Sequence, residues 1–143
     1  MSQLGARLNG LSSTVLSLFR IVFGLLYLMH GTSKLFGWPV GPTVPSGSQF
    51  WWAGILELVL GSLLVLGLFT RAAAFIAAGE MAVAFFTQHF PSGFWPIENK
   101  GELAVLFCWG FFLLVFAGSG WLAVDSILGR RNKTVTAAPV ERV

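Results

Sequence analysis

The chain has 143 residues, of which 55% are hydrophobic and only 10% are charged, and its formal net charge is +3. A soluble domain carries about 25% charged residues, so this composition excludes an ordinary soluble protein and indicates a polytopic membrane protein. Nucleic-acid binding is also excluded, because the basic residues after position 129 form a short tail that is typical of a topology signal or of attraction to anionic headgroups.

Four hydrophobic stretches follow one another along the chain, separated by polar or Pro/Gly-rich segments. At about 1.5 Å per residue, each is long enough to cross a hydrocarbon core of about 30 Å. Residues 37–49 and 91–100 are the long loops, and residues 70–71 form a tight turn. We expect one membrane domain of residues 1–131 and a flexible basic tail of residues 132–143. The expected spans are residues 15–36, 50–69, 72–90 and 102–123.

The first hydrophobic stretch is too long for the apolar core of a cleaved signal peptide and has no A-x-A-like cleavage site, so we interpret it as a retained span. The single cysteine, Cys108, lies inside a hydrophobic run and excludes an intramolecular disulfide. The chain has no CxxC motif and no Cys/His cluster, so no metal centre is expected. We interpret Cys108 as a packing residue.

The distribution of basic residues predicts the orientation of the spans. Every Lys and Arg except Lys34 and Lys100 falls on the side that holds both termini and the 70–71 turn. The positive-inside rule therefore places both termini in the cytoplasm of a bacterium, with the chain in the inner membrane. Trp38, Trp51 and Trp95 fall on the opposite side, where aromatic rings suit the headgroup region.

Small residues recur at helical spacing within the first three spans and predict how the helices pack. Gly24 and Gly31 share a face of the first span, and Gly54 and Gly61 share a face of the second. Small residues let helices approach closely in lipid. We therefore predict an all-α membrane protein, an antiparallel bundle of four transmembrane helices with a polar interior.

Ionisable side chains within the expected spans are functionally informative, because charge in lipid costs roughly a few kcal/mol or more per group. His30 and Lys34 are one helical turn apart and share a face. Glu57 lies about 10 Å from the outer start of its span, close to the depth of His30, and Glu80 lies near the middle. The candidate ligand-binding residues of the outer half are His30, Lys34, Glu57, Glu80, His89 and Glu102.

The same side chains can instead be interpreted as ion pairs that hold the helices together. Lys34 could pair with Glu57 or Glu102, or extend to the surface. At the cytoplasmic end, the candidates for structural ion pairs are Arg20, Arg71 and Asp125. The sequence leaves both interpretations open.

A quinone matches the chemistry of the outer residues. Its ring can stack on aromatic rings such as that of Tyr27, its carbonyl oxygens can accept hydrogen bonds from His or Lys, and a Glu can supply or take the proton. Haem is not expected, because His30 lies about 9 Å below the outer end of its helix while His89 lies at the end of its own. No covalently bound cofactor is expected.

An ordered set of motifs on these spans resembles the DoxX family of small four-span bacterial membrane proteins. The resemblance covers roughly residues 15–128. The motifs are Arg20-x3-Gly24, His30-Gly31-x2-Lys34-Leu35, Glu57-x3-Gly61-x5-Gly67-Leu68-x-Thr70-Arg71, Met81-x2-Ala84, Asn99-x-Gly101-Glu102 and Gly118-x-Gly120-x4-Asp125.

The resemblance implies a redox-linked membrane subunit rather than a particular substrate. Some members of the family are described as the membrane subunit of a thiosulfate:quinone oxidoreductase. Others are linked to oxidoreductase complexes in oxidative-stress defence, or to quinone and catechol handling. Nothing in the residues themselves indicates a sulfur-oxidising site.

Three functions remain open at this point. The first is a quinone-binding or quinone-reactive subunit, with His30, Lys34, Glu57 and Glu102 facing one cavity. The second is a non-catalytic assembly subunit of a larger oxidoreductase complex. The third is a proton-coupled transporter using Glu80, which is disfavoured because internal repeats and broken helices are not evident. The expected partners are lipid and either another protein or further copies of the chain.

Overall fold

The computed structural model describes residues 3–129, and all regular secondary structure in that part of the chain is helical. A π-helical turn, η1 (Phe85–His89), and a 3-10 turn, η2 (Phe90–Ser92), continue the third helix. The predicted all-α class is confirmed. The tail predicted for residues 132–143 lies outside the described residues. The long α-helices are α1 (Gln3–Phe36), α2 (Gln49–Leu66), α3 (Thr70–Ala84) and α4 (Glu102–Ala117), and residues 124–129 form a further short helical segment.

Three helical stretches within residues 3–129 are long and apolar enough to cross a membrane: α1, α2 and the stretch Thr70–Ser92. The remaining helix, α4, is apolar but has only 16 residues. Large hydrophobic side chains such as Val22, Phe75 and Trp109 are exposed along these helices. Such a surface suits lipid better than water.

Two boundaries differ from the predicted spans. The first helix begins at Gln3 instead of residue 15, and its 34 residues extend for about 51 Å, well beyond the hydrocarbon core. Hydrophobicity marks only the part of a helix that lies in lipid, so the polar first part was missed. The fourth helix, α4, ends at Ala117 instead of residue 123, because Gly118 takes a positive φ of 86° that is incompatible with a right-handed helix.

The turn between the second and third helices was predicted at residues 70–71 but lies one turn earlier. Gly67 ends α2 with φ of 69°, and Phe69 before α3 also has a positive φ, of 50°. Thr70 and Arg71 are already the first residues of α3. Arg71 therefore projects from a helix rather than from a turn.

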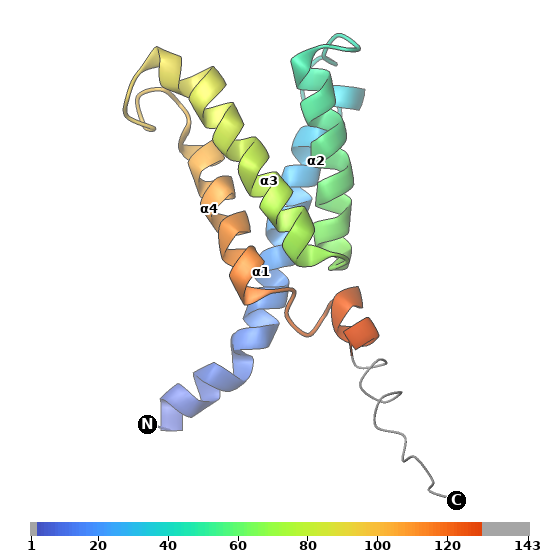
Figure 1. Cartoon of the computed structure of the whole chain (residues 1–143), viewed down its shortest axis with the longest axis vertical. Helices are drawn as coiled ribbons and strands as arrows, with labels where there is room; N and C mark the ends of the chain where they lie inside the picture. The colour runs from blue at the N-terminus through green and yellow to red at the C-terminus, as the bar shows by residue number, and fades with distance from the viewer. Residues whose placement is uncertain (1–2, 130–143) are drawn as a thin grey trace, which may run out of the picture.

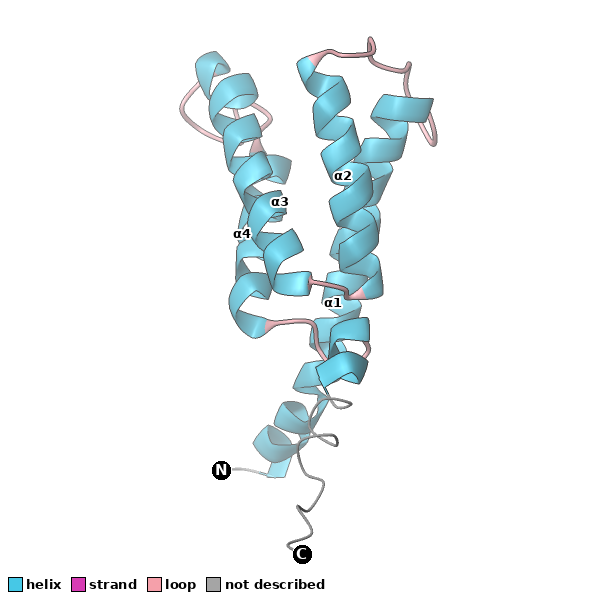
Figure 2. Cartoon of the chain, turned by 45° about the vertical axis from the view of Figure 1, so that its right-hand side comes forward, coloured by secondary structure: helices cyan, strands magenta, loops and turns pink. Residues whose placement is uncertain are grey.

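The helices pair as two antiparallel hairpins, with α1 packed along α2 and α3 packed along α4. The hairpins meet at the end that carries the α2–α3 turn, and they diverge toward the end that carries the two long loops (Figures 1 and 2). We call these the turn end and the loop end. The start of α1 and the segment after α4 both lie at the turn end.

Glycines bring α1 and α2 into close contact, as the small-residue faces predicted. A Cβ added at Gly31 would lie 2.7 Å from the Leu58 nitrogen and 2.8 Å from the Gly54 oxygen. A Cβ added at Gly61 would lie 2.9 Å from the Leu28 Cα. Only residues without a side chain allow the two backbones to approach this closely.

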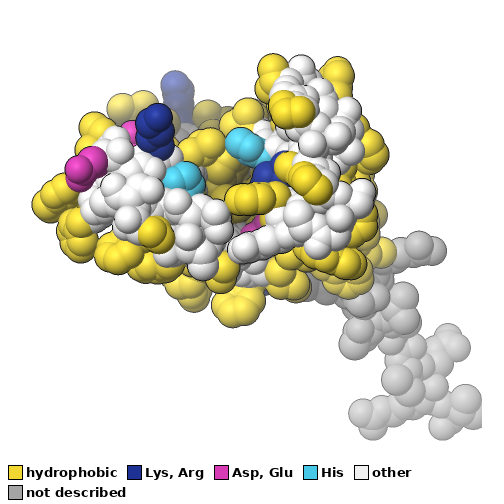
Figure 3. Space-filling model, turned by 90° about the horizontal axis from the view of Figure 1, so that it is seen from above, with side chains coloured by type: hydrophobic (Ala, Val, Ile, Leu, Met, Phe, Trp, Pro, Cys, Tyr) yellow, Lys and Arg dark blue, Asp and Glu magenta, His cyan; other side chains and the backbone are white. Residues whose placement is uncertain are grey.

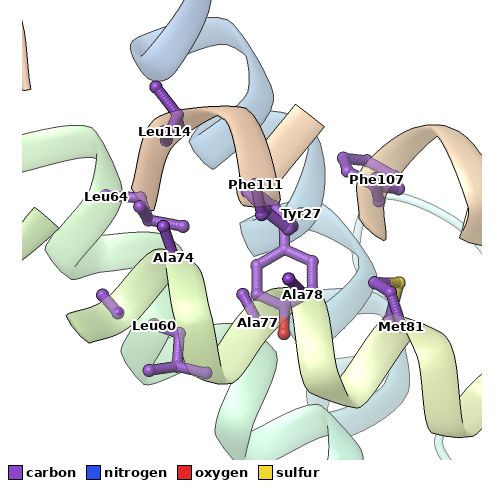
Figure 4. Packing of buried hydrophobic residues seen from close by; sticks show 11 residues of the cluster. Tyr27, Leu60, Leu64, Ala74, Ala77, Ala78, Met81, Phe107, Phe111 and Leu114 are labelled. Carbon is purple, nitrogen blue, oxygen red and sulfur yellow. The ribbon is translucent and has the colours of Figure 1, made fainter. Parts of the chain in front are cut away.

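Aromatic and small side chains fill the core where the hairpins meet. Tyr27, Leu64 and Phe111 are completely buried, and the rings of Tyr27 and Phe111 are 4.8 Å apart in an edge-to-face arrangement. Figure 4 shows the Tyr27 ring reaching from α1 to Ala77 and Ala78 of α3, with its hydroxyl oxygen pointing away from Phe111. The core therefore holds a polar group at its edge.

Candidate functional site

Five ionisable side chains from three helices form a polar cluster between the hairpins: Tyr27, His30 and Lys34 from α1, Glu57 from α2 and Glu80 from α3. The α1 residues are spaced by three and four, which places them on one face of that helix. Seen from the loop end, histidine, basic and acidic side chains are visible in the hollow between the two lobes of the molecule (Figure 3).

Lys34 and Glu57 form an ion pair in which Lys34 Nζ lies 2.5 Å from Glu57 Oε1. Among the described residues this is the single ion pair between side chains, and it joins α1 to α2. Glu57 is only 2% exposed, and its second oxygen, Oε2, is buried without a hydrogen-bond partner. The pair thus leaves one carboxylate oxygen and part of the ammonium group unused.

Tyr27 and Glu80 form a second contact, in which the Tyr27 hydroxyl donates a hydrogen bond to Glu80 Oε2. This contact joins α1 to α3. The other oxygen, Glu80 Oε1, is buried without a partner. Sequence reasoning considered Tyr27 only for ring stacking. Its spacing of three from His30 and seven from Lys34 is the signal that could have added it to the polar group.

The two contacts are electrostatically linked. Lys34 attracts both Glu57 and Glu80, and the two carboxylates are close enough to repel each other. His30 is exposed and lies close enough to Lys34 for the two side chains to interact electrostatically. Its ring is edge-on to the ring of Phe107 of α4, with centroids 5.8 Å apart. All four α-helices therefore contribute to the surroundings of the cluster.

The remaining candidates of the outer half have other surroundings. His89 Nδ1 lies 3.2 Å from the Asn99 carbonyl oxygen, in the loop between α3 and α4. Asn99 is buried and holds that loop, because its amide donates to the Gly93 oxygen and its side-chain oxygen accepts from the Gly101 nitrogen. Glu102 is exposed at the first residue of α4.

No group of three or more metal-ligating side chains able to hold a metal ion occurs within residues 3–129. The cluster offers different chemistry: two carboxylates, one ammonium group, one phenol and one imidazole, beside an aromatic wall. These groups can donate and accept hydrogen bonds and exchange protons. They suit an uncharged molecule with hydrogen-bonding oxygens better than they suit a metal.

At the turn end, the side chains of Arg20, Arg71 and Asp125 all bind the backbone, and among the described residues none of the three is in direct contact with an oppositely charged side chain. Arg20 is completely buried and donates to the carbonyl oxygens of Ser119, at 2.9 Å, and Val65, at 2.8 Å. It also donates to the carbonyl oxygens of Leu64 and Leu122. The last carbonyl oxygens of a helix have no hydrogen-bond partner within the helix. A guanidinium group has five N–H donors and can therefore donate to several of these oxygens at once.

Arg71 and Asp125 cap helix ends in the same way. Arg71 Nη1 donates to the Val115 and Phe116 oxygens at the end of α4. The Asp125 carboxylate accepts from the Phe69 and Thr70 nitrogens at the start of α3, at 2.9 and 2.8 Å. A cation at a helix C-terminus and an anion at an N-terminus both complement the helix dipole.

An open depression of about 560 Å³ lies beside these caps, between the start of α3 and the end of α4. Its lining includes Thr70, Arg71, Gly118 and Asp125. It lies at the end opposite the loops. The polar cluster and this depression are therefore separate features.

Fold and cluster together define a class: a small all-helical membrane protein with ionisable side chains between its helices. The model of the DoxX family matches residues 15–90, about half of the chain, and the chain belongs to that family. It is a multi-pass bacterial membrane protein. An uncharacterized protein of Haemophilus influenzae (strain ATCC 51907 / DSM 11121 / KW20 / Rd) is 42% identical over 118 residues, which cover 78% of this chain and 88% of the relative. No solved structure matches.

Proposed function

We propose that this chain is the membrane subunit of a quinone-linked redox complex, and that the polar cluster binds the quinone or a similar small molecule. The observation that carries the proposal is the pair of buried, unpartnered oxygens, Glu57 Oε2 and Glu80 Oε1. Buried carboxylate oxygens normally have a partner, so these two favour a ligand or proton that the chain itself does not supply.

A quinone headgroup is complementary to these surroundings. Its carbonyl oxygens accept hydrogen bonds from the free N–H groups of Lys34 and from His30, and its flat ring lies beside Phe107. Reduction of a quinone to the quinol takes two electrons and two protons. In this proposal Glu57 and Glu80 take up two protons from water and pass them to the quinone oxygens, and a redox partner protein supplies the two electrons.

The proposed membrane arrangement has four spans, with α4 as the fourth and both termini in the cytoplasm. The loop end then faces outward, and the cluster lies in the outer half of the bilayer. The 16 residues of α4 extend for about 24 Å, slightly short of the hydrocarbon core, which local thinning of the bilayer accommodates. Among the described residues outside the cluster, His89 and Glu102 lie at the proposed outer mouth.

Quinone binding tests this proposal directly. We expect a lipid extract of the chain purified from its native membrane to contain quinone, and a short-chain quinone to quench the tryptophan fluorescence of the delipidated chain. Replacing Glu57 by Gln removes one charged acceptor and part of the attraction on Lys34, so quinone affinity falls about tenfold, or 1.4 kcal/mol.

The matched control is Glu98→Gln, which removes the same charge from an exposed position in the α3–α4 loop. Its quinone affinity stays at the wild-type value. An extract without quinone, together with no quenching by an added quinone, contradicts the proposal. An equal loss of affinity in both variants assigns the effect to overall charge instead.

The second candidate function is an assembly subunit without a ligand. The observation that favours it is that each cluster contact joins two helices, Lys34 to Glu57 across α1 and α2, and Tyr27 to Glu80 across α1 and α3. In that case the chain co-purifies with a larger oxidoreductase whose turnover is unchanged by Glu57→Gln. Loss of turnover with an intact complex favours the quinone site.

A further inference from the structure

An apolar stripe runs along the outer side of α1 from its first turn into the membrane-spanning part. Its members follow one another at alternating spacings of four and three residues, and all are between 40% and 67% exposed. The buried face of α1, which includes Ser17, Arg20, Gly24 and Tyr27, points into the bundle. The residues of the stripe are Leu4, Leu8, Leu11, Val15, Leu18, Val22, Leu25 and Met29.

The spacing of the stripe is that of a heptad repeat, and the residue types match the two core positions of such a repeat. One core position, d, is leucine four times, at Leu4, Leu11, Leu18 and Leu25. The other core position, a, is occupied by Leu8, by the β-branched residues Val15 and Val22, and by Met29. Leucine at d with valine at a is the pattern that favours parallel two-stranded coiled coils.

Contact with lipid alone does not account for this pattern. A lipid-facing helix is apolar over its whole exposed surface, and it follows the period of 3.6 rather than 3.5. Within residues 3–14 the stripe is narrow and its neighbours are polar, among them Asn9, Ser12 and Ser13. A narrow a/d stripe between polar flanks is a seam for another helix.

The area and charge of the stripe fit a second copy of this chain. Eight side chains that each expose on the order of 100 Å² offer about 800 Å² per chain, which is what one partner contributes to a standard interface. Residues 3–29 contain no acidic side chain, and Arg7 is the exposed cation beside the stripe. In a parallel pair the position of Arg7 faces that of Ser12 in the next heptad, so no like charges meet.

We propose that two copies of the chain pair in parallel through this stripe of α1. Copies inserted in the same orientation have parallel α1 helices, so the membrane itself supplies the required direction. The pairing is self-complementary, and the same surface serves both copies about a twofold axis. It leaves the polar cluster, on the other side of α1, free for its ligand, and it does not depend on the proposed function.

Cysteine cross-linking in native membranes tests the pairing. In a Cys108→Ala background, single cysteines replace Leu4, Leu11 and Leu18 in turn, and an added oxidant forms a disulfide between copies. We expect dimer formation to be about tenfold faster at these d positions than at the controls Asn9→Cys and Ser13→Cys, which lie on exposed sides of the same helix turns.

A second measurement needs no new disulfide. Energy transfer between differently labelled copies in liposomes reports the dimer, and Leu4→Ser with Leu11→Ser weakens it about tenfold, while Ser12→Ala with Ser13→Ala does not. Equal cross-linking at all exposed positions means that only lipid covers the stripe, and it overturns the proposal. In membranes that contain both the Leu4→Cys and the Leu18→Cys variants, faster cross-linking of one variant to the other than of each variant to itself means antiparallel helices, and it overturns the parallel pairing.

Discussion

At the scale of single residues, Arg20 shows how a charged side chain becomes tolerable inside the bundle. It is completely buried, yet it has no carboxylate in direct contact and binds four carbonyl oxygens instead. These oxygens belong to the end of α2 and to the segment after α4. The helix dipole of α2 adds to the attraction, because the negative end of a helix favours a cation.

Replacing Arg20 by Gln removes the charge and most of the donors, and it leaves several buried carbonyls without a partner. Each such group costs about 1–3 kcal/mol, so we expect a loss of about 3–5 kcal/mol in the free energy of unfolding. Thermal unfolding in detergent measures it. The control Arg7→Gln, at an exposed position of α1, leaves the melting temperature unchanged. Equal melting temperatures for the two variants contradict the role of Arg20.

At the scale of elements, the contact between α1 and α2 depends on glycine rather than on hydrophobic side chains. In lipid there is no hydrophobic driving force between helices, so close packing of backbones carries the association. Gly31 meets Gly54 and Leu58, and Gly61 meets Leu28. By contrast, an added Cβ at Gly79 on α3 would meet nothing within 4 Å.

The two kinds of glycine should respond in opposite directions to the same substitution. Gly31→Ala forces a methyl group to 2.7 Å from backbone, so the helices move apart and stability falls by about 1–3 kcal/mol. Gly79→Ala fills open space in a helix interior and raises stability by about 0.5–1 kcal/mol. Denaturation of both variants in the same detergent gives the comparison. A Gly31→Ala variant as stable as the Gly79→Ala variant would contradict the close packing.

At the scale of the whole molecule, most of the hydrogen bonds that join the two hairpins lie at the turn end, and the Tyr27–Glu80 contact of the polar cluster is a further link between them. Arg20 links α1 to the end of α2 and to the segment after α4, and Asp125 links that segment to the start of α3. Away from these links the hairpins diverge toward the loop end, where the polar cluster lies (Figure 1). The polar cluster therefore lies where the two hairpins separate, beyond the contacts of the turn end.

The orientation of the molecule in the membrane follows from where the basic residues lie. We expect a fluorescent protein fused to the C-terminus to fold in the cytoplasm, because Arg7 and Arg71 lie at the turn end, as do residues 118–129 after α4. In a Cys108→Ala background, Lys100→Cys at the loop end reacts with an impermeant thiol reagent in intact spheroplasts, whereas Arg71→Cys reacts only after lysis. The reverse labelling pattern would invert the proposed topology.

How much of this could be predicted depends on the range of the interactions involved. Hydrophobic runs predicted the helices, because lipid imposes an average property on about 20 neighbouring residues. They missed the polar start of α1 at Gln3, since that part of the helix leaves the lipid. The pairing of Lys34 with Glu57 was one of two pairings considered, because helical spacing gives the face and depth of a residue but not its partner on another helix.

The sequence by itself determined the all-helical class, the membrane location and the family, because each depends on composition, local periodicity or motif order. Only the tertiary structure decided which groups meet. Arg20 binds carbonyls rather than Asp125, and Tyr27 joins Glu80, because backbone carbonyls are invisible in a sequence and helices meet through rotations that no local pattern fixes. Contacts between helices depend on how the hairpins pack, and that is a property of the whole chain.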